Sequence, residues 1–422
     1  MVNTAGTNGT DNGERPSDDV LKESLMRYAR LQLKVPARLA NLASEHNYRI
    51  GKTKLNNLNK EFNIPTTRKP PPLPVVTTLV CAKLENDLAQ GNGPEAMKTF
   101  LALDGYQVPR DTIREVMKDN APGAAKRRYP GTKDKVTRKN LTAQGVFQEL
   151  HCDGHEKLGS AALRMGPVGI AIYGFRDKGS GTDCGLRAVP DARHAVVIGH
   201  LYLYLVLEFG AFPMQITVDK GSETGEMYAA QVALRETVTP DIDPLKFPPV
   251  VALKSTNNIP IENLWKWLRK TCGRSLREWI EDGKTNGIFN PGSMIHVHLF
   301  HWLWSQIVQI ALDQFTDYWN YHKSHNNPHK DLPSGVPPLE IFRNPQAYRL
   351  AWLGTPVEAD VVDALRENLT CSREEAFQWV PEEFDTAANQ VYADLRCPKL
   401  EPSRGWTIFG QMAPQLENVF DI

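Results

Sequence analysis

Three carboxylates stand where a folded chain could use them as metal ligands. Asp153 ends an apolar run that begins at Val146, and Asp219 ends a shorter run that begins at Gln215 and meets a glycine turn. Glu262 lies in a later stretch with helical periodicity. Acids at two strand ends and on a later helix are the set that a two-metal phosphoryl-transfer site requires. Mg²⁺ prefers oxygen ligands and takes few of them from the protein, which leaves room for water and phosphate.

The helix predicted to begin near Pro260 divides into two faces at 100° per residue. The apolar face holds Ile261, Leu264, Trp267 and Leu268, and the polar face holds Glu262, Lys266, Arg269 and Lys270. Proline suits the first helical position, and Asn257 or Asn258 can accept hydrogen bonds from the open N–H groups. The same pattern also fits an ordinary surface helix in which Glu262 and Lys266 form an i,i+4 pair.

The three acids lie in the blocks Asp153-Gly-His-Glu-Lys-Leu, Asp219-Lys-Gly-Ser-Glu and Ser255-x-x-Asn-x-x-Ile-Glu-x-Leu-Trp265. In this order, the blocks resemble those of the DDE integrase/transposase superfamily, in particular its eukaryotic, transposon-derived integrase core domain proteins. The resemblance covers residues 145–345. It implies that Asp153, Asp219 and Glu262 are the catalytic and metal-binding acids. One departure is Thr224, where the family usually has asparagine.

The resemblance also implies a reaction and partners. A protein of this type is a metal-dependent enzyme that holds two Mg²⁺ or Mn²⁺ ions, cleaves DNA and transfers its strands, acting as a homo-oligomer on DNA without a small-molecule cofactor. The residues then expected to contact DNA near the acids are Lys157, Asn258, Lys266, Arg269 and Lys270. Two alternatives share the same acids and stay open: a domesticated, catalytically silent DNA-binding protein, and a simple RNase H-like nuclease.

A sheet and a helix must bring the acids together. Strands are predicted at 146–153, 167–175, 185–189, 215–219 and 250–253, and helices at 191–209, 223–237 and 294–321. Hairpin spacing followed by helix–strand alternation gives a mixed sheet covered by helices. This order matches an RNase H-like layout. The predicted fold class is therefore α/β, with 145–345 as an integrase catalytic core.

Helical units are predicted in front of this core. Residues 18–65 show the rhythm of a helix-turn-helix unit, and 77–120 form a second helical unit. The last helix of the first unit carries Lys52, Lys54 and Asn56, which could enter a major groove. A plain three-helix unit with a solvated polar face is the alternative. Residues 1–17 are predicted to be a disordered leader.

Charge and proline mark the connecting segments. The Pro-rich stretch 66–76 is predicted to be a stiff, extended linker. The basic linker 121–144 contains Lys126, Arg127 and Arg128, which are candidates for sequence-independent contacts with DNA and for a weak nuclear signal. A solvated linker is the other interpretation of this run.

The C-terminal region 346–422 is acidic. From Gly354 to Ile422 there are thirteen acidic and five basic residues, a net charge of −8. Because the whole chain has a formal net charge of zero, the rest carries +8. A basic body suits a polyanion partner. A role in protein interaction or in masking the DNA site is the hypothesis for the acidic region.

Length and composition limit the number of domains and the class of protein. With 422 residues, two or three domains are expected, and 41% hydrophobic with 23% charged residues is ordinary for a globular protein. Six cysteines without a Cys-x-x-Cys pair argue against a zinc knuckle and a disulfide scaffold. No run has membrane-spanning length, and the N-terminus does not resemble a signal peptide. A nuclear or other intracellular location without a membrane is therefore expected.

Two further polar groups are predicted to be structural. Asp177 and Asp183 flank a glycine-rich segment that lacks the ending of a phosphate loop, so a hairpin tip is expected. His296, His298 and His301 fall near the long apolar helix 294–321. Core packing beside tryptophans is favoured over metal binding, because no cysteine or acid lies near them in the sequence.

Overall fold

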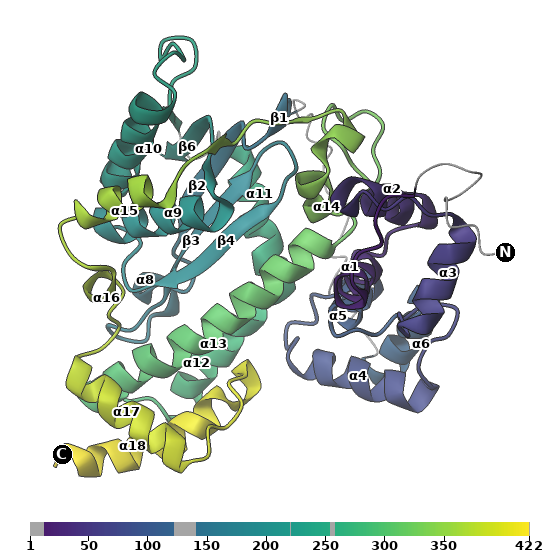
Figure 1. Ribbon diagram of the computed structural model, residues 1–422. Helices are drawn as coiled ribbons and strands as arrows, with labels where there is room; N and C mark the ends of the chain where they lie inside the picture. Colours follow the sequence, from purple (N-terminus) through teal and green to yellow (C-terminus); the bar gives the residue numbers. More distant parts are fainter. Residues whose placement is uncertain (1–11, 122–140, 220, 254–257, 422) are drawn as a thin grey trace.

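The centre of the molecule is a mixed sheet with helices on both faces (Figure 1). The computed structural model describes residues 12–121, 141–219, 221–253 and 258–421. Within them, the sheet has five strands in the order β4-β3-β2-β6-β7. The bounds of these strands are β2 Glu149–His155, β3 Ala171–Asp177, β4 Asp183–Val189, β6 Gln215–Asp219 and β7 Val250–Leu253. The α/β class and the mixed sheet predicted from the sequence are confirmed.

The pairing of the strands changes direction at β2. The neighbours β2, β3 and β4 are antiparallel, as consecutive hairpins must be, and their tip is the glycine-rich segment between Asp177 and Asp183. On the other side of β2, the strands β6 and β7 run parallel to it. Parallel pairing requires long crossovers, which here are helical. The ends of β2 and β6 therefore meet at one edge of the sheet.

Two layers of helices bury the two faces. The strongly apolar α9 (Ala195–Phe209) and α10 (Gly225–Val238) cover one face and share a core with alternate residues of β2, β3 and β6. The other face is covered by α11 (Ile259–Leu268), α12 (Arg274–Thr285) and α13 (Met294–Tyr321), which share a second core. The predicted helix 294–321 is confirmed at both ends.

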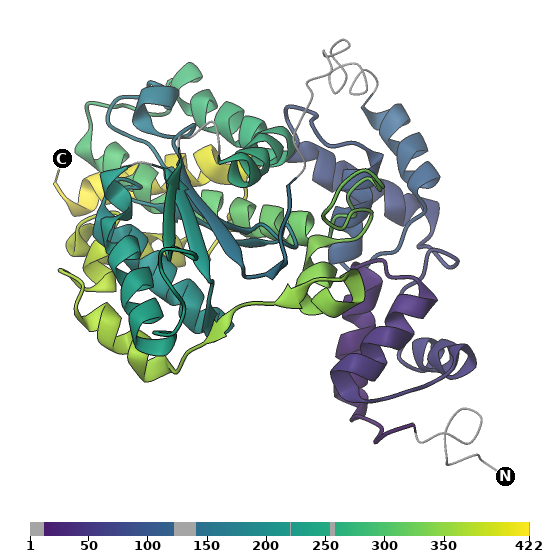
Figure 2. The ribbon, with the colours of Figure 1, turned by 90° about the horizontal axis from the view of Figure 1, so that it is seen from above.

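Six helices form two small units beside this sheet in the described N-terminal part (Figure 2). The first unit is α1 (Asp18–Arg30), α2 (Val35–His46) and α3 (Lys52–Glu61), and the second is α4 (Leu73–Glu85), α5 (Pro94–Leu103) and α6 (Arg110–Asn120). Each unit has its own apolar cluster. The prediction of an extended linker through residue 76 is wrong at its end, since α4 begins at Leu73. Prolines are tolerated in a first helical turn, where their missing N–H has no partner to lose.

Polar contacts attach these units to the core. The amide of Asn41 donates to both carboxylate oxygens of the buried Glu340, at 3.1 and 3.0 Å. Glu340 belongs to α14 (Pro338–Arg343). The amide of Asn92 donates to the carbonyl of Thr271 at 3.0 Å, in the π-helical turn η4 (Arg269–Gly273). The second unit therefore contacts the turn that directly follows α11.

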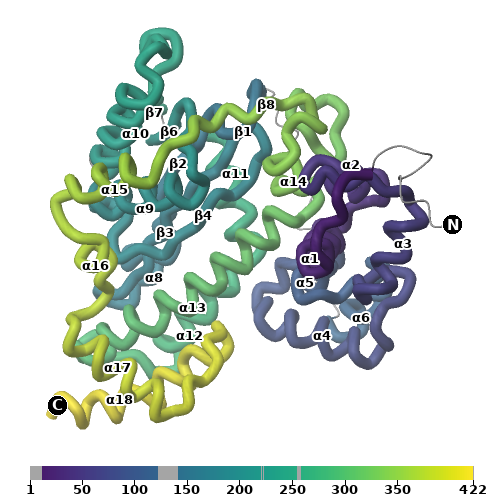
Figure 3. Tube along the Cα trace, viewed as in Figure 1, coloured from purple at the N-terminus to yellow at the C-terminus, as the bar shows by residue number. Residues whose placement is uncertain are grey.

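The acidic C-terminal region runs along the helices of the core (Figure 3), and its apolar residues belong to both core clusters. It contains α15 (Ala359–Glu367), α16 (Arg373–Ala376), α17 (Glu382–Asp394) and α18 (Gly405–Val419). Trp406 and Phe409 of α18 are buried with α13, and the Trp406 indole donates to the carbonyl of Trp279 at 2.7 Å. Its acidic residues lie on the outside of helices whose inner faces are apolar.

Short elements complete the described chain. They are β1 Gly145–Val146, α8 Ser160–Leu163, β5 Ala211–Phe212, η2 Ser222–Thr224, η5 Pro345–Tyr348, β8 Ala351–Trp352, β9 Thr355–Pro356 and η6 Pro402–Arg404. Strand β8 pairs with β1, and β9 pairs with β5. His298 packs against Phe384, and His301 accepts a hydrogen bond from the Gly169 backbone at 3.4 Å, in agreement with predicted core packing. Among the described helices, none is long and apolar enough to cross a membrane.

Candidate functional site

Strand register brings the first two acids together. In the parallel pair β2–β6, Leu150 lies opposite Ile216 and His151 lies opposite Thr217. Side chains alternate between faces, so Leu150 and Ile216 enter the core under α9. Two residues further along each strand, on the same face as His151 and Thr217, are Asp153 and Asp219. Since neighbouring strands lie about 4.8 Å apart, this register makes the two acids neighbours under α11.

Helix α11 places the third acid over the same edge. Asn258, Glu262 and Trp265 are separated by four and three residues, so they lie on one face of the helix. At one end of this row, the Asn258 amide donates to the Cys152 carbonyl at 3.1 Å and lies 3.5 Å from Asp219 Oδ1. At the other end, the Trp265 indole donates to Asp153 Oδ2 at 2.8 Å. Glu262, between them and exposed, is therefore directed toward the acid pair.

Electrostatics agrees with this placement. Burial raises the pKa of the Asp153 carboxyl to about 7, and the negative charges of Asp219 and Glu262 act in the same direction. The hydrogen bonds from Trp265 and from the Gly154 backbone oppose the rise in this pKa but do not cancel it. The three predicted acids thus share one neighbourhood, in which the charges of Asp219 and Glu262 disfavour ionisation of Asp153.

This donor set fits a hard divalent cation by chemistry and charge. Carboxylate oxygens are the ligands that Mg²⁺ and Mn²⁺ prefer, and a cation would neutralise the repulsion that Asp153 experiences. The distances between these side chains argue against a preformed metal site. Among the residues that the structure describes, no three His, Cys, Asp or Glu side chains are gathered closely enough to hold a metal ion. The three acids would therefore have to move closer together before they could hold one ion.

A polar network between β2 and the start of α11 holds this helix in place. His151 joins two partners, with Nδ1 at 2.6 Å from Asn258 Oδ1 and Nε2 at 2.9 Å from Glu149 Oε1. Glu149 also accepts from the Lys178 ammonium at 2.6 Å and the Thr217 hydroxyl at 2.8 Å. Burial alone would raise the pKa of Glu149, but His151 and Lys178 lower it to about 2. The network fixes Asn258 and, through it, the start of the helix that carries Glu262.

This network was not among the sequence predictions. A signal exists, because Glu149, His151 and Asp153 alternate along one strand and so point to one face. The indole of Trp265 was also missed as a partner of Asp153. It was predicted on neither face of the helix, and it is buried at the contact with β2.

The predicted nucleic-acid contact of Asn258 is wrong. This residue is 1% exposed, and its amide is used by His151 and Cys152 inside the protein. It occupies the N-cap position of α11, as predicted for Asn257 or Asn258, but its side chain makes no capping hydrogen bond. Asn257 lies outside the described residues.

The predicted cations near the acids separate into two groups. Lys157 and Arg269 lie near His155, since burial and then these two charges lower the His155 pKa to about 4. The His155 ring in turn stacks on Trp265 with centroids 4.8 Å apart. Lys157 and Arg269 are therefore close to the acid site.

Lys270 contacts Trp267, whereas Lys157 and Arg269 lie near His155. Its ammonium sits 4.9 Å from the centre of the Trp267 ring, which packs beside Trp319 of α13. Lys270 belongs to the π-helical turn that follows α11, which ends at Leu268. Its predicted contact with DNA phosphates stays a prediction. Lys266 remains on α11 and is exposed.

The remaining predicted DNA contacts are remote from the acids in the chain. Lys52, Lys54 and Asn56 are exposed on α3, whose buried residues are Leu55 and Leu58. Their side chains are thus available at the surface, as either the groove-reading or the solvated-face interpretation requires. Lys126, Arg127 and Arg128 lie outside the described residues.

Comparison with protein-family models and with curated proteins finds no match to this chain.

Proposed function

We propose that this chain is a metal-dependent DNA-processing enzyme of the DDE integrase/transposase type, with an RNase H-like core. The observation that carries the proposal is the meeting of Asp153 and Asp219 at adjacent strand ends, with the Glu262 face of α11 above them. The strand order β4-β3-β2-β6-β7, antiparallel on one side of β2 and parallel on the other, supports the RNase H-like part.

The acids would hold Mg²⁺ or Mn²⁺, two ions in the full site. Such ions activate an attacking water or orient a 3′-hydroxyl, and they stabilise the leaving oxygen. The chain's own contribution is positional. The Trp265 indole holds one oxygen of Asp153, and the Asn258 amide lies between Asp219 and the backbone of β2. Lys157 and Arg269 supply positive charge beside the acids for DNA phosphates.

A catalytically silent DNA-binding protein is the second candidate. The observation that favours it is the absence, among the described residues, of a closely gathered metal-binding group. A simple nuclease without strand transfer would use the same acids and differs only in its products. Assembly as a homo-oligomer on DNA and a nuclear location belong to the leading proposal.

The test is incubation with labelled DNA ends in Mg²⁺ or Mn²⁺, with cleaved and joined products scored separately. Asp153→Asn, Asp219→Asn and Glu262→Gln should each abolish both products while DNA affinity is retained. Glu278→Gln, on an exposed face of α12, is the matched control and should react normally.

The outcomes separate the candidates. Cleavage without joining would support the simple nuclease. DNA binding without any product would support the catalytically silent DNA-binding protein. Normal turnover by any of the three acid variants would refute the assignment of the site.

A further inference from the structure

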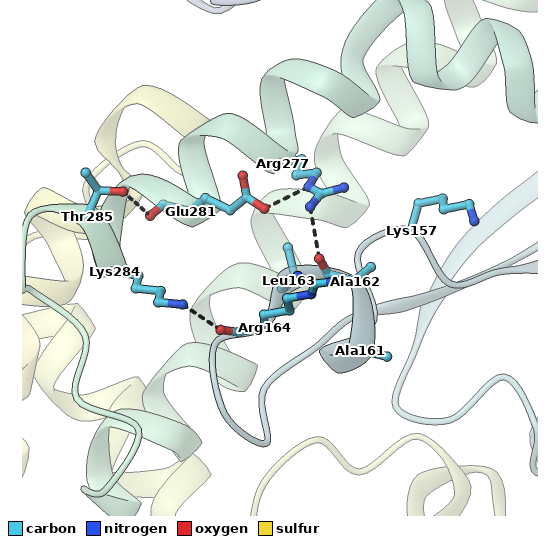
Figure 4. A pocket seen from close by; sticks show the side chains of 9 residues that line it. All are labelled: Lys157, Ala161, Ala162, Leu163, Arg164, Arg277, Glu281, Lys284 and Thr285. Atoms are coloured by element: carbon cyan, nitrogen blue, oxygen red, sulfur yellow. Dashed lines mark hydrogen bonds and ion pairs between the residues drawn. The ribbon is translucent and has the colours of Figure 1, made fainter.

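A basic pocket lies between α12 and the segment that contains α8 (Figure 4). Its volume is about 760 Å³. Four of its lining side chains are cationic, namely Lys157, Arg164, Arg277 and Lys284, and the one lining carboxylate is Glu281. Small-molecule pockets are mostly apolar, whereas this charged lining suits an anion.

Two of the cations are fixed in place by the backbone. Arg277 donates to the Ala162 carbonyl at 2.9 Å, and Lys284 donates to the Arg164 carbonyl at 2.9 Å (Figure 4). Carbonyl oxygens orient these groups without neutralising their charge. Arg277 and Lys284 are seven residues apart on α12, so they lie on one face about 10 Å apart along the helix.

The positive charge of the pocket is only partly balanced. Arg277 also donates to Glu281 at 2.8 Å, so one carboxylate faces four cations. A guanidinium has five N–H donors, of which this geometry uses two. Among the described residues, Lys157 and Arg164 form no ion pair, and Glu156 next to Lys157 is already paired with Arg193 at 2.8 Å. Several donors in the pocket therefore remain available to a ligand.

Lys157 connects the pocket to the strand that carries the first acid. Strand β2 carries Asp153 and leads into Lys157 four residues later, which limits their separation to about 13 Å. A DNA strand has one phosphate per 3.4 Å of helix axis, so this distance corresponds to about four nucleotides. One strand could therefore pass from the acids into the pocket.

We propose that this pocket binds consecutive backbone phosphates of the DNA strand whose scissile phosphate lies at the acids. The inference rests on the proposed function and extends it by naming the surface that holds the strand. Phosphate contacts position a nucleic acid without reading its sequence. Arg277 and Lys284 would give two fixed points on the strand, with Lys157 and Arg164 joining when it enters.

The test measures DNA affinity of the whole chain by fluorescence anisotropy over a series of salt concentrations, without metal. The double variant Arg277→Gln with Lys284→Gln should weaken binding of unrelated sequences alike. It should also lower the slope of log affinity against log salt by about 2, about 1 for each lost contact. The matched control is Lys399→Gln with Arg404→Gln, which removes two exposed charges elsewhere and should leave the slope unchanged.

A second variant guards against misfolding. Lys157→Gln with Arg164→Gln breaks no described hydrogen bond of these side chains, so it should fold and still lower the slope by about 2. If the slope of log affinity against log salt is unchanged in both double variants while the wild type binds DNA, the pocket proposal is wrong. The proposed function is not affected by that result.

Two other outcomes are distinguishable. If the wild-type chain binds no DNA, the proposed function fails and takes the pocket proposal with it. If the pocket variants bind DNA normally but lose binding to a labelled polyglutamate peptide, the pocket takes an acidic protein segment, and the DNA proposal is wrong.

Discussion

The substitution Asp153→Asn should stabilise the metal-free fold at alkaline pH. Asparagine has nearly the shape of aspartate, and its carbonyl oxygen can still accept from the Trp265 indole. It cannot carry the negative charge that burial, Asp219 and Glu262 disfavour. The same change should abolish turnover, so stability and activity are expected to move in opposite directions.

The magnitude follows from linkage between protonation and folding. The Asp153 pKa is raised from 3.8 to about 7 in the folded protein, so the native state binds the proton more tightly than the unfolded chain. The resulting stability is fully present below pH ~4 and is lost as the pH rises through ~7. The full difference corresponds to about 4 kcal/mol, and solvent screening at this partly buried site reduces it to about 2 kcal/mol. The asparagine variant does not suffer this loss.

The assay is urea unfolding in the presence of a chelator at several pH values. The free energy of unfolding of Asp153→Asn relative to wild type should increase by about 2 kcal/mol between pH ~4 and ~8. Asp241→Asn, in an exposed loop, should show no such trend. Adding Mg²⁺ at alkaline pH should stabilise the wild type and leave Asp153→Asn unchanged, because only the native wild-type site binds it. A pH-independent difference between Asp153→Asn and wild type would refute the view that burial and the charges of Asp219 and Glu262 disfavour ionisation of Asp153.

Further outcomes concern the neighbours of the site and the attached units. Trp265→Phe keeps an aromatic ring but removes the 2.8 Å hydrogen bond to Asp153. The Mn²⁺ affinity measured by calorimetry should therefore fall about 10- to 100-fold. An unchanged Mn²⁺ affinity would contradict the positioning role of Trp265. Asn41→Leu leaves the buried Glu340 carboxylate without two hydrogen bonds, so the free energy of unfolding should drop by about 1–3 kcal/mol, with faster proteolysis of the N-terminal unit. Asn56→Ala should change preference among DNA sequences in a binding selection if α3 reads bases, whereas a uniform effect would favour a solvated face.

The sheet and the acids could be predicted because local pattern determines them. A short apolar run that ends in an acid and a glycine turn gave β6 and Asp219, and continuous apolar periodicity gave both ends of α13. The adjacency of Asp153 and Asp219 needs only parallel pairing of their strands, which the helix–strand alternation suggested. These features depend on neighbours in sequence or on one pairing.

The details around Glu262 could not be predicted in the same way. The π-helical turn after Leu268 has no signature in the apolar periodicity, so an ideal helical wheel could not foresee it. Asn258 was expected to face DNA, and only the three-dimensional structure brings His151, over 100 positions earlier, against its side chain. Likewise, the net charge of 346–422 describes its surface and does not reveal that Trp406 is buried against α12 and α13.

The packing of α18 also affects how this chain can fold during synthesis. The apolar side of α13 is buried by residues of α18, about a hundred positions later in the chain. The strands β8 and β9, which also belong to the C-terminal region 346–422, pair with β1 and β5. Contacts between such distant segments slow folding, because a long loop must close before they form. A ribosome-bound chain that ends before Gly405 therefore exposes Trp304, Phe300 and their neighbours, a surface prone to aggregation. We therefore expect this surface to stay exposed until α18 has emerged and packed against α13.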